Sequence, residues 1–258
     1  MLSKISKLIS KKNKSKIVCL TAYSKNIAEE LDSYVDLILV GDSLGSVLYN
    51  YKSTRDVTLD VMIEHSKSVR LGIKKSLMIV DMPYNTYRNK QEALRNCKRV
   101  VKETKCDGVK VEGGVKIKNI VKHLTKNKIP VMGHIGILPQ LDRGKFKSKG
   151  KSEKEKIQLI NDALILEKEG CFAIVLECIE KNSSKKITKS IKIPTIGIGS
   201  SHYCDGQILV TDDLLGLTNS KIKFVKKYVD LKKYIRKGVK KFKFEVLKKK
   251  YPNKRYSY

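Results

Sequence analysis

Long apolar runs are missing from this sequence of 258 residues. It contains no stretch of 18 or more apolar residues, so it predicts no membrane span. Residues 1–12 also lack an apolar segment long enough for a signal peptide. Their pattern predicts instead a basic amphipathic helix with Leu2, Ile5, Leu8 and Ile9 on one face.

Paired cysteine motifs are absent as well. The six cysteines have no C-x-x-C spacing, and several lie in apolar runs: Cys19, Cys97, Cys106, Cys171, Cys178 and Cys204. This pattern favours reduced, mostly buried thiols over disulfide bonds or a zinc site. We therefore expect a cytoplasmic protein.

Acidic residues are scarce, with 26 Asp and Glu against 55 Lys and Arg, and the formal net charge is +29. Clustered basic residues would suggest nucleic acid or another anionic partner. Here the lysines are scattered along the chain, and only the segment 221–255 is dense. Because Lys, Asn and Ile are abundant together, we favour the hypothesis of an A/T-rich genome and expect no specific nucleic-acid binding.

Glycine motifs that bind nucleotides are missing too. No G-x-G-x-x-G motif follows the first predicted strand, Gly197-Ile-Gly199 comes too late in the chain to serve, and there is no P-loop. The sequence therefore lacks the usual signatures of a dinucleotide-binding fold and of a P-loop protein.

Predicted strands and helices alternate about eight times along the chain. Such alternation predicts a parallel sheet with helical crossovers, and eight repeats in roughly 250 residues favour a closed (β/α)8 TIM barrel. We expect a single domain over residues 1–258. The predicted strands are 17–21, 37–40, 77–80, 108–114, 130–134, 172–176, 194–198 and a last one near 223–225; the main helices are 24–31, 59–71, 90–104, 116–125, 153–169 and 231–248.

The stretch 108–114 carries charge inside a predicted strand. Alternate side chains share a face, so Lys110 and Glu112 point one way and Val109 and Val111 the other. An exposed edge strand with a surface ion pair would have this pattern. The alternative is a strand whose charged face looks into a polar site, because buried parallel strands are normally apolar throughout.

Polar residues end five successive predicted strands: Asp42, Asp81, Glu112, His134 and Glu177. Any one of them alone is equally consistent with a helix cap or a solvated loop residue. In a barrel, however, these strand ends lie on one rim, where catalysis takes place. The series therefore predicts an active site.

Three of these residues are carboxylates that need compensation. Two carboxylates about 4 Å apart repel by roughly 4 kcal/mol at an effective dielectric constant of 20. With Asp42, Asp81 and Glu112 on one rim, Lys110 offsets one of three negative charges and leaves about −2. This remaining negative charge must be compensated by a divalent cation or by protonation. Oxygen ligands suit Mg²⁺ or Mn²⁺ rather than Zn²⁺. His134 fits either a ligand or a hydrogen-bonding role.

This set of residues predicts a metal-assisted reaction of an oxo acid. A magnesium ion with open positions can chelate a 2-oxo acid and stabilise the negative charge of an enolate. Lys110 is placed to help with that charge or to hold the substrate carboxylate, and Glu177 is the candidate base. The residues do not specify the acid or the electrophile.

Eight short motifs of the sequence resemble those of a known family. The motifs Leu20-Thr-Ala-Tyr23, Val40-Gly-Asp-Ser-Leu-Gly45, Val80-Asp-Met-Pro83, Val109-Lys-Val-Glu-Gly-Gly114, Gly133-His-Ile-Gly136, Val175-Leu-Glu-Cys178, Ile193-Pro-Thr-Ile-Gly-Ile-Gly199 and Cys204-Asp-Gly-Gln207 occur in order. Together they resemble the ketopantoate hydroxymethyltransferase (3-methyl-2-oxobutanoate hydroxymethyltransferase) family over about residues 16–228.

The resemblance implies a (β/α)8 barrel of the phosphoenolpyruvate/pyruvate type. It implies transfer of a hydroxymethyl group from 5,10-methylenetetrahydrofolate to 3-methyl-2-oxobutanoate, giving 2-dehydropantoate, the first step of pantothenate and hence coenzyme A biosynthesis. It places Mg²⁺, with Mn²⁺ as a substitute, on Asp42, Asp81 and Glu112. It also implies a homo-oligomer, often a decamer, with small-molecule substrates. The lack of a long apolar run separately predicts no membrane partner. Contacts to the oxo acid fall on Asp42, Ser43, Asp81 and Lys110, and the proton acceptor falls on Glu177.

Three segments depart from the family pattern: 136–140, where a threonine is lost, 143–150 and 199–202. They concern the loop over the substrate and the folate contacts, and they leave the predicted metal and base positions intact. Two other functions compete. One is a carbon–carbon lyase or phosphonomutase acting on an oxo acid, and the other is a basic nucleic-acid-binding protein without catalysis.

Overall fold

Eight parallel strands close into a barrel in the computed structural model, which describes residues 3–142 and 147–258. Each strand pairs with the next in sequence order, and the eighth pairs with the first. The predicted closed barrel is confirmed. The strands are β1 (Ile17–Thr21), β2 (Leu37–Val40), β3 (Leu77–Asp81), β4 (Gly108–Glu112), β5 (Val131–Gly136), β6 (Ala173–Glu177), β7 (Thr195–Ile198) and β8 (Gly206–Leu209).

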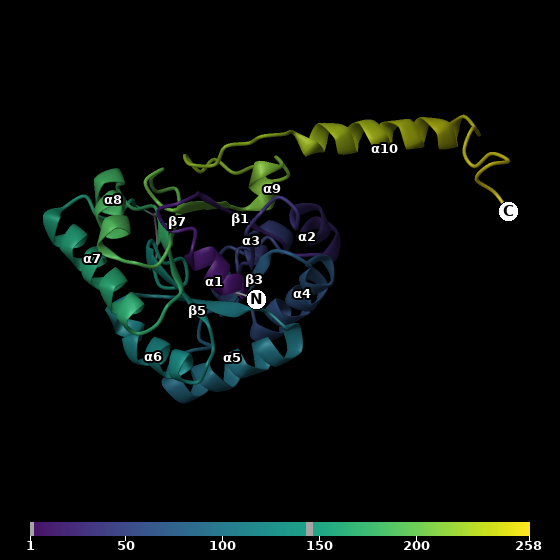
Figure 1. Ribbon diagram of the computed structural model, residues 1–258. Helices are drawn as coiled ribbons and strands as arrows, with labels where there is room; N and C mark the ends of the chain where they lie inside the picture. The colour runs from purple at the N-terminus through teal and green to yellow at the C-terminus, as the bar shows by residue number, and fades with distance from the viewer. Residues whose placement is uncertain (1–2, 143–146) are drawn as a thin grey trace. The chain divides into compact units, whose positions relative to one another are not determined.

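In the described part of the chain, six helices cover the outside of this barrel (Figure 1). Capping explains where several of them begin: the Asn89 side chain accepts from the N–H of Glu92, and Ser152 accepts from the N–H of Glu155. The helices are α2 (Lys25–Leu31), α4 (Leu59–Gly72), α5 (Lys90–Thr104), α6 (Lys118–Lys126), α7 (Glu153–Lys168) and α8 (Lys181–Ser190), with shorter pieces α3 (Leu44–Leu48), η1 (Thr54–Asp56) and η2 (Val115–Ile117).

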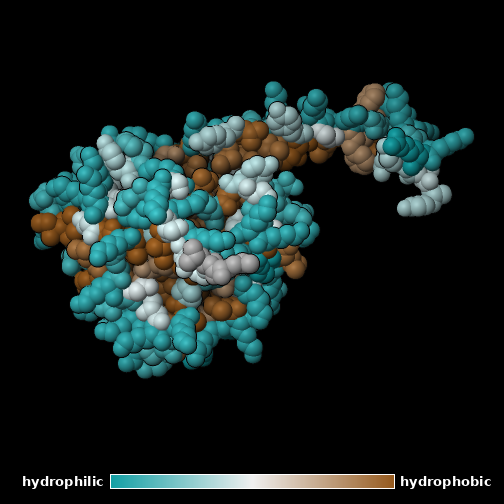
Figure 2. All heavy atoms as spheres, viewed as in Figure 1, coloured by the Kyte–Doolittle hydropathy of each residue, from teal (hydrophilic) through white to brown (hydrophobic). Residues whose placement is uncertain are grey.

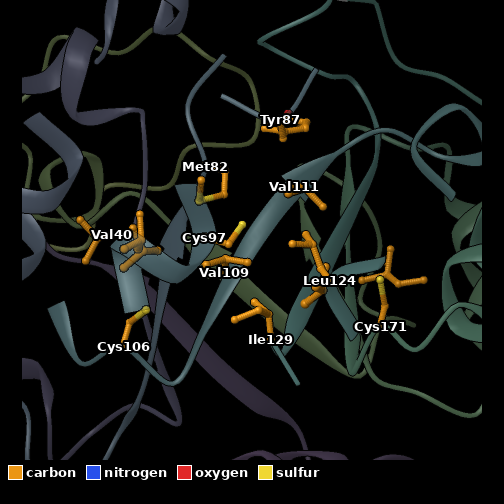
Figure 3. Packing of buried hydrophobic residues seen from close by; sticks show 14 of the residues in the cluster. Val40, Met82, Tyr87, Cys97, Cys106, Val109, Val111, Leu124, Ile129 and Cys171 are labelled. Carbon is orange, nitrogen blue, oxygen red and sulfur yellow. The ribbon is translucent and has the colours of Figure 1, made fainter. Parts of the chain in front are cut away.

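The strands separate two apolar clusters because their side chains alternate between faces. On β4, Val109 and Val111 face outward and join the cluster between sheet and helices, as predicted. Figure 3 shows them among other members of that cluster, including Cys97 and Leu124. A second cluster lies inside the barrel and includes Leu37, Leu39, Leu77, Ile79, Met132 and Val175.

Helix α1 (Lys4–Ile9) belongs to the inner cluster. Leu8 is buried there, and Ile5 and Ile9 pack against the same residues, so the predicted apolar face of the N-terminal helix is confirmed for these three positions. Leu2 lies outside the described residues. The segment after the helix is fixed by an ion pair, since Lys12 Nζ lies 2.7 Å from Asp205 Oδ2, directly before β8.

The prediction of a last strand near 223–225 is wrong, because residues 223 and 224 form a turn. The eighth strand is β8, which follows β7 through a short loop instead of a helix. Gly206 allows the close approach, since a Cβ there would lie 2.6 Å from the carbonyl oxygen of Ile17. A four-residue strand with a glycine and an exposed glutamine has little apolar periodicity, so no local pattern predicts it.

Residues 211–258 form a compact unit distinct from the unit that ends at Val210. It contains α9 (Thr211–Leu214) and α10 (Leu231–Leu247), and every residue of α10 is at least partly exposed. Figure 2 shows hydrophobic and hydrophilic residues side by side along α10, with Tyr234, Ile235, Val239, Phe242 and Val246 among its exposed apolar residues. The expectation of one domain over residues 1–258 stays a prediction.

Two predictions from composition can be compared with the structure. Within residues 3–142 and 147–258, helices long and apolar enough to cross a bilayer do not occur. All six cysteines lie in the described part of the chain and are free thiols; five are buried and Cys178 is half-buried.

Candidate active site

The inward-facing residues change from apolar to polar along each of the central strands. On β3 the series is Leu77, Ile79, Asp81, and on β5 Met132 is followed by His134. The strand register places Asp81 beside Lys110, and Glu112 beside His134. The carboxyl end of the barrel interior is therefore a layer of charged side chains above an apolar core.

Lys110 is the centre of this layer and is only 4% exposed. Its Nζ lies 3.0 Å from Asp81 Oδ1, 3.8 Å from Glu112 Oε1 and 3.2 Å from His134 Nδ1. Glu112 is 1% exposed. These values exclude the edge-strand alternative for β4, which lies between β3 and β5.

His134 connects two carboxylates. Its Nδ1 lies 3.4 Å from Glu112 Oε1, and its Nε2 lies 3.2 Å from Glu177 Oε2. Glu177, at the end of β6, has a side chain that is 19% exposed, against 3% for His134 and 2% for Glu112. Glu177 is thus the carboxylate of this group that is most open to a small molecule.

Asp42 follows β2 and completes the acidic side of the layer. Its N–H donates to Asp81 Oδ2 at 3.1 Å, and its own Oδ2 accepts from Gln140 Nε2 at 2.7 Å. The preceding Gly41 permits this tight turn, because a Cβ there would lie 2.9 Å from Ser43 Oγ. Asp42 and Asp81 are therefore adjacent at the ends of neighbouring strands.

The segment after β5 closes over these residues. Gln140 is 1% exposed, its N–H donates to Glu112 Oε2 at 3.1 Å, and its side chain accepts from Tyr87 Oη at 2.5 Å. Arg55 donates from Nε to the carbonyl of Gln140 at 2.8 Å. These contacts fix the loop at its start.

The buried charges shift one another's pKa values. Burial, together with the neighbouring Asp81 and Glu112, raises the pKa of Asp42 well above its usual range, and burial also raises the pKa of Asp81. Burial acts to raise the pKa of Glu112, but His134 and Lys110 outweigh it and lower that pKa. Asp42 is thus the least compensated carboxylate of the layer.

The two cations are held by the acids around them. Burial acts to lower the pKa of Lys110, but Asp81 and Glu112 outweigh it and raise that pKa. Burial and Lys110 act to lower the pKa of His134, whereas Glu112 and Glu177 raise it, and the result is about 9. Lys110 Nζ and a protonated His134 Nδ1 are both hydrogen-bond donors and cannot bond to each other. In the imidazolium form, the Nδ1–H therefore donates to Glu112.

The described residues do not contain a group of three or more His, Cys, Asp or Glu side chains arranged to hold a metal ion unaided. Glu112 Oε1 faces Lys110 and His134, and the adjacent acids are Asp42 and Asp81. The predicted three-carboxylate metal site stays a prediction. An arrangement of two neighbouring carboxylates is nevertheless one that Mg²⁺ uses, together with water and substrate oxygens.

This arrangement of fold and charged layer can be compared with known proteins. The family model described as "Ketopantoate hydroxymethyltransferase" matches residues 3–254. The chain belongs to the ketopantoate hydroxymethyltransferase family. The predicted family, and with it an enzyme of the hydroxymethyltransferase type, is confirmed.

Curated relatives of the ketopantoate hydroxymethyltransferase family match over almost their full length. A protein of Pelagibacter ubique (strain HTCC1062) named 3-methyl-2-oxobutanoate hydroxymethyltransferase is 58% identical over 100% of both chains. Proteins with the same name from Trichodesmium erythraeum (strain IMS101) and Helicobacter pylori (strain ATCC 700392 / 26695) are 47% and 44% identical, over 95% and 97% of this chain and 95% and 94% of theirs.

Solved structures agree with the barrel. Phosphonopyruvate hydrolase in complex with oxalate and Mg²⁺ superimposes with a TM-score of 0.61 at 10% identity, over 81% of each chain. Oxaloacetate acetylhydrolase in complex with 3,3-difluorooxalacetate has a TM-score of 0.59 at 13% identity, over 95% of this chain and 96% of that one. At such low identity these likenesses show the fold alone.

Every residue predicted for the site lies at the carboxyl end of the barrel: Asp42, Ser43, Asp81, Lys110, Glu112, His134 and Glu177. The residues that the prediction left without a role are Gln140, Tyr87 and Arg55. The signals for Gln140 were its place in segment 136–140, which was compared with the family pattern, and a Pro-Gln pair shortly after β5. The departure predicted at 143–150 falls partly on residues 143–146, outside the described residues.

Proposed function

We propose that this chain transfers a hydroxymethyl group from 5,10-methylenetetrahydrofolate to 3-methyl-2-oxobutanoate, giving 2-dehydropantoate in the first step of pantothenate and coenzyme A biosynthesis. Whole-length relatives that carry the corresponding name support the reaction. The observation that carries the proposal is Lys110, buried at the carboxyl end of the barrel among Asp81, Glu112 and His134. A buried ammonium beside acids and an open carboxylate suits an anionic oxo acid that forms an enolate.

A divalent cation fits the acidic side of this layer. Asp42 and Asp81 offer oxygen donors from adjacent strand ends, and Asp42 is the least compensated acid. Hard cations such as Mg²⁺ take oxygen ligands of this kind, often from only one or two carboxylates. We propose that Asp42, Asp81 and Glu112 hold Mg²⁺ or Mn²⁺. When bound, the cation supplies electrostatic stabilisation of negative charge that develops on the substrate.

We assign the oxo acid to the residues around Lys110. The Lys110 ammonium attracts the substrate's negative charge, and Asp81 keeps the ammonium in place at 3.0 Å. Ser43 Oγ lies 2.9 Å from Tyr23 Oη, so that its hydroxyl is held at the edge of the acidic layer. Asp42 completes this proposed substrate set.

The reaction must remove a proton from C3 of the oxo acid, next to its carbonyl group. We propose Glu177 as the base, because a carboxylate that ligates a cation is held in its charged form and accepts a proton poorly. Its side chain is the most open of the acids here, and His134 Nε2 lies 3.2 Å from it. Water replaces both bonds of the methylene carbon to folate nitrogens, its two protons going to those nitrogens and its oxygen staying on the one-carbon unit. The enolate carbon forms its bond to that unit, and the resulting alkoxide takes up the proton removed from C3.

We propose further that the protein is a cytoplasmic homo-oligomer, a decamer by family resemblance. Free thiols support the compartment. Exposed apolar side chains on α10, including Ile235 and Phe242, are typical of a contact surface and support assembly. Light scattering from the purified protein measures the oligomer directly.

The test of the reaction is direct. The purified protein is incubated with 3-methyl-2-oxobutanoate, methylenetetrahydrofolate and Mg²⁺, and 2-dehydropantoate is detected by mass spectrometry. A parallel sample without folate separates this activity from that of a lyase or mutase acting on the oxo acid. Turnover of the oxo acid without folate would contradict the proposal.

A further inference from the structure

Gln140 joins two of the three acids at the carboxyl end of the barrel. Its backbone N–H donates to Glu112 Oε2 at 3.1 Å, while its side-chain Nε2 donates to Asp42 Oδ2 at 2.7 Å. The same Nε2 also donates to the carbonyl of Met82 at 3.0 Å. One residue from the loop after β5 therefore holds acids from β4 and from the end of β2.

The partners of the Gln140 amide fix its orientation. Tyr87 Oη accepts from the N–H of Glu112 at 3.3 Å, so its own proton is free to go to Gln140 Oε1 at 2.5 Å. Turning the amide over would place its oxygen against the Asp42 carboxylate and the Met82 carbonyl, where both partners are acceptors. Figure 3 shows Tyr87 at the edge of the apolar cluster, and this packing keeps the hydroxyl in place.

The backbone of Gln140 is held by a different residue. Arg55, in η1, donates to the carbonyl of Gln140 at 2.8 Å and to that of Leu141 at 3.0 Å. The Arg55 guanidinium lies 5.3 Å from the centre of the Tyr84 ring. Both the side chain and the backbone of Gln140 are thus fixed by groups outside its own loop.

These contacts occupy one oxygen of each carboxylate. Asp42 Oδ2 and Glu112 Oε2 accept hydrogen bonds from neutral donors, which stabilise the ionised acids and add no positive charge that would compete with a cation. Groups that hydrogen-bond to ligating carboxylates orient them, and their loss typically costs about 10–100-fold in metal affinity.

We propose that Gln140 is a positioning residue that orients Asp42 and Glu112 for a divalent cation, with Tyr87 setting its amide. This inference rests on the proposed function only in taking these acids as the cation site. It adds a loop residue to the site, beyond the residues at the strand ends. Gln140 acts by orienting the two acids and does not contact the substrate.

The test measures Mn²⁺ binding to the full-length protein without substrates, by the loss of the free Mn²⁺ paramagnetic resonance signal. Gln140→Leu keeps a side chain of similar volume and removes the amide, and should weaken Mn²⁺ binding about 10–100-fold. Tyr87→Phe keeps the ring and removes the hydroxyl, and should give a smaller loss in the same direction. Both variants should raise the KM for the oxo acid more than they lower kcat.

Gln158→Leu is the matched control. Gln158 lies on α7, and its Nε2 donates to Asp162 Oδ1 at 3.1 Å, so this variant also removes an amide that is bonded to a carboxylate. It should bind Mn²⁺ like the wild-type protein. Thermal unfolding of all variants identifies any that do not fold; should Gln140→Leu be one of them, Tyr87→Phe decides the test.

Wild-type Mn²⁺ affinity and KM in folded Gln140→Leu and Tyr87→Phe overturn the positioning role, whatever the reaction is. A wild-type protein that binds Mn²⁺ but makes no 2-dehydropantoate refutes the proposed function, and weaker Mn²⁺ binding by Gln140→Leu then still supports the positioning role.

Discussion

Two buried lysine–aspartate pairs lie at opposite ends of the barrel. At the amino end, Lys12 and Asp205 are 2.7 Å apart, and the same Asp205 oxygen accepts from the N–H of Thr195 at 2.8 Å. At the carboxyl end, Lys110 and Asp81 are 3.0 Å apart. Both pairs are less than a tenth exposed.

Their surroundings differ in net charge. Lys12 also donates to the carbonyl of Thr188, so the pair at the amino end is neutral and bonded to neutral groups. Lys110 and Asp81 are joined by Asp42 and Glu112, and this end keeps a surplus of acid. A buried ion pair is therefore no sign of function by itself; the neighbouring charges separate a pair that stabilises the fold from one that is suited to bind a ligand.

Removing divalent metal should separate the two ends most completely. We expect EDTA to abolish turnover and added Mg²⁺ or Mn²⁺ to restore it, while the pair at the amino end is unaffected. Asp81→Asn keeps the size of the side chain but removes a charge, and should weaken binding of both metal and oxo acid. Full turnover in a metal-stripped sample would contradict the cation site.

Replacing the proposed base should have the next largest effect. Glu177→Gln should slow turnover about 10²–10⁴-fold, the usual contribution of a positioned general base, while metal and oxo acid still bind. The measurement needs no folate, because the enzyme with Mg²⁺ should exchange the C3 hydrogen of 3-methyl-2-oxobutanoate with D₂O. Exchange at the wild-type rate would exclude Glu177 and make His134 the candidate, to be examined in His134→Asn.

Removing the lysine at each end compares the two pairs directly. Lys110→Met should lower kcat/KM about 10²–10³-fold, the loss typical for one stabilising group at a developing charge. Lys12→Met, the matched control, should leave turnover per folded enzyme nearly unchanged. Equal losses of turnover in the two variants would show that the two pairs do not differ in function.

The same variant should show its effect in stability. Lys12→Met leaves Asp205 buried without its cation and should lower the free energy of unfolding by about 3–5 kcal/mol. The neighbouring Lys11–Asp36 pair is more exposed, at 35% and 26%, so Lys11→Met should cost only about 0–1 kcal/mol. Urea denaturation of both variants measures the difference, and similar midpoints would contradict it.

The smallest effect is expected at the chain end. If the surplus lysines are solvated, removing the residues after Lys248 should leave turnover per folded enzyme nearly unchanged. Steady-state kinetics on the shortened chain, together with its circular dichroism spectrum, measures this. A large loss of turnover with the fold intact would give the basic tail a role in catalysis or assembly.

Strand ends were predictable from the sequence because two local rules combine there. Apolar runs locate β2 to β6, and alternation places Lys110 and Glu112 on one face, so Asp42, Asp81 and Glu177 follow from chain order and barrel closure. The position of Gln140 does not follow from these rules. Its contacts depend on how an irregular loop folds back over β2 and β4, and loop residues have no periodicity to reveal this.

Strand β8 was missed for the same reason, because its position is not determined by the local sequence. Its four residues pair with β1 because Gly206 lets the two backbones approach, which is a property of the closed barrel and not of the local sequence. Apolar residues near 223–225 resembled a strand, but local composition does not distinguish a short strand from a turn.

The register of β4 determines where the chain tolerates a change in length. A single residue inserted between Gly108 and Lys110 would turn Lys110 and Glu112 toward the helices and bring the valines into the barrel. An insertion at the exposed end of α6, near Asn127, would leave that alternation unchanged. Tolerance of insertions along this chain should therefore change within a few residues, from abrupt failure inside the strands to near indifference in the turns that precede them.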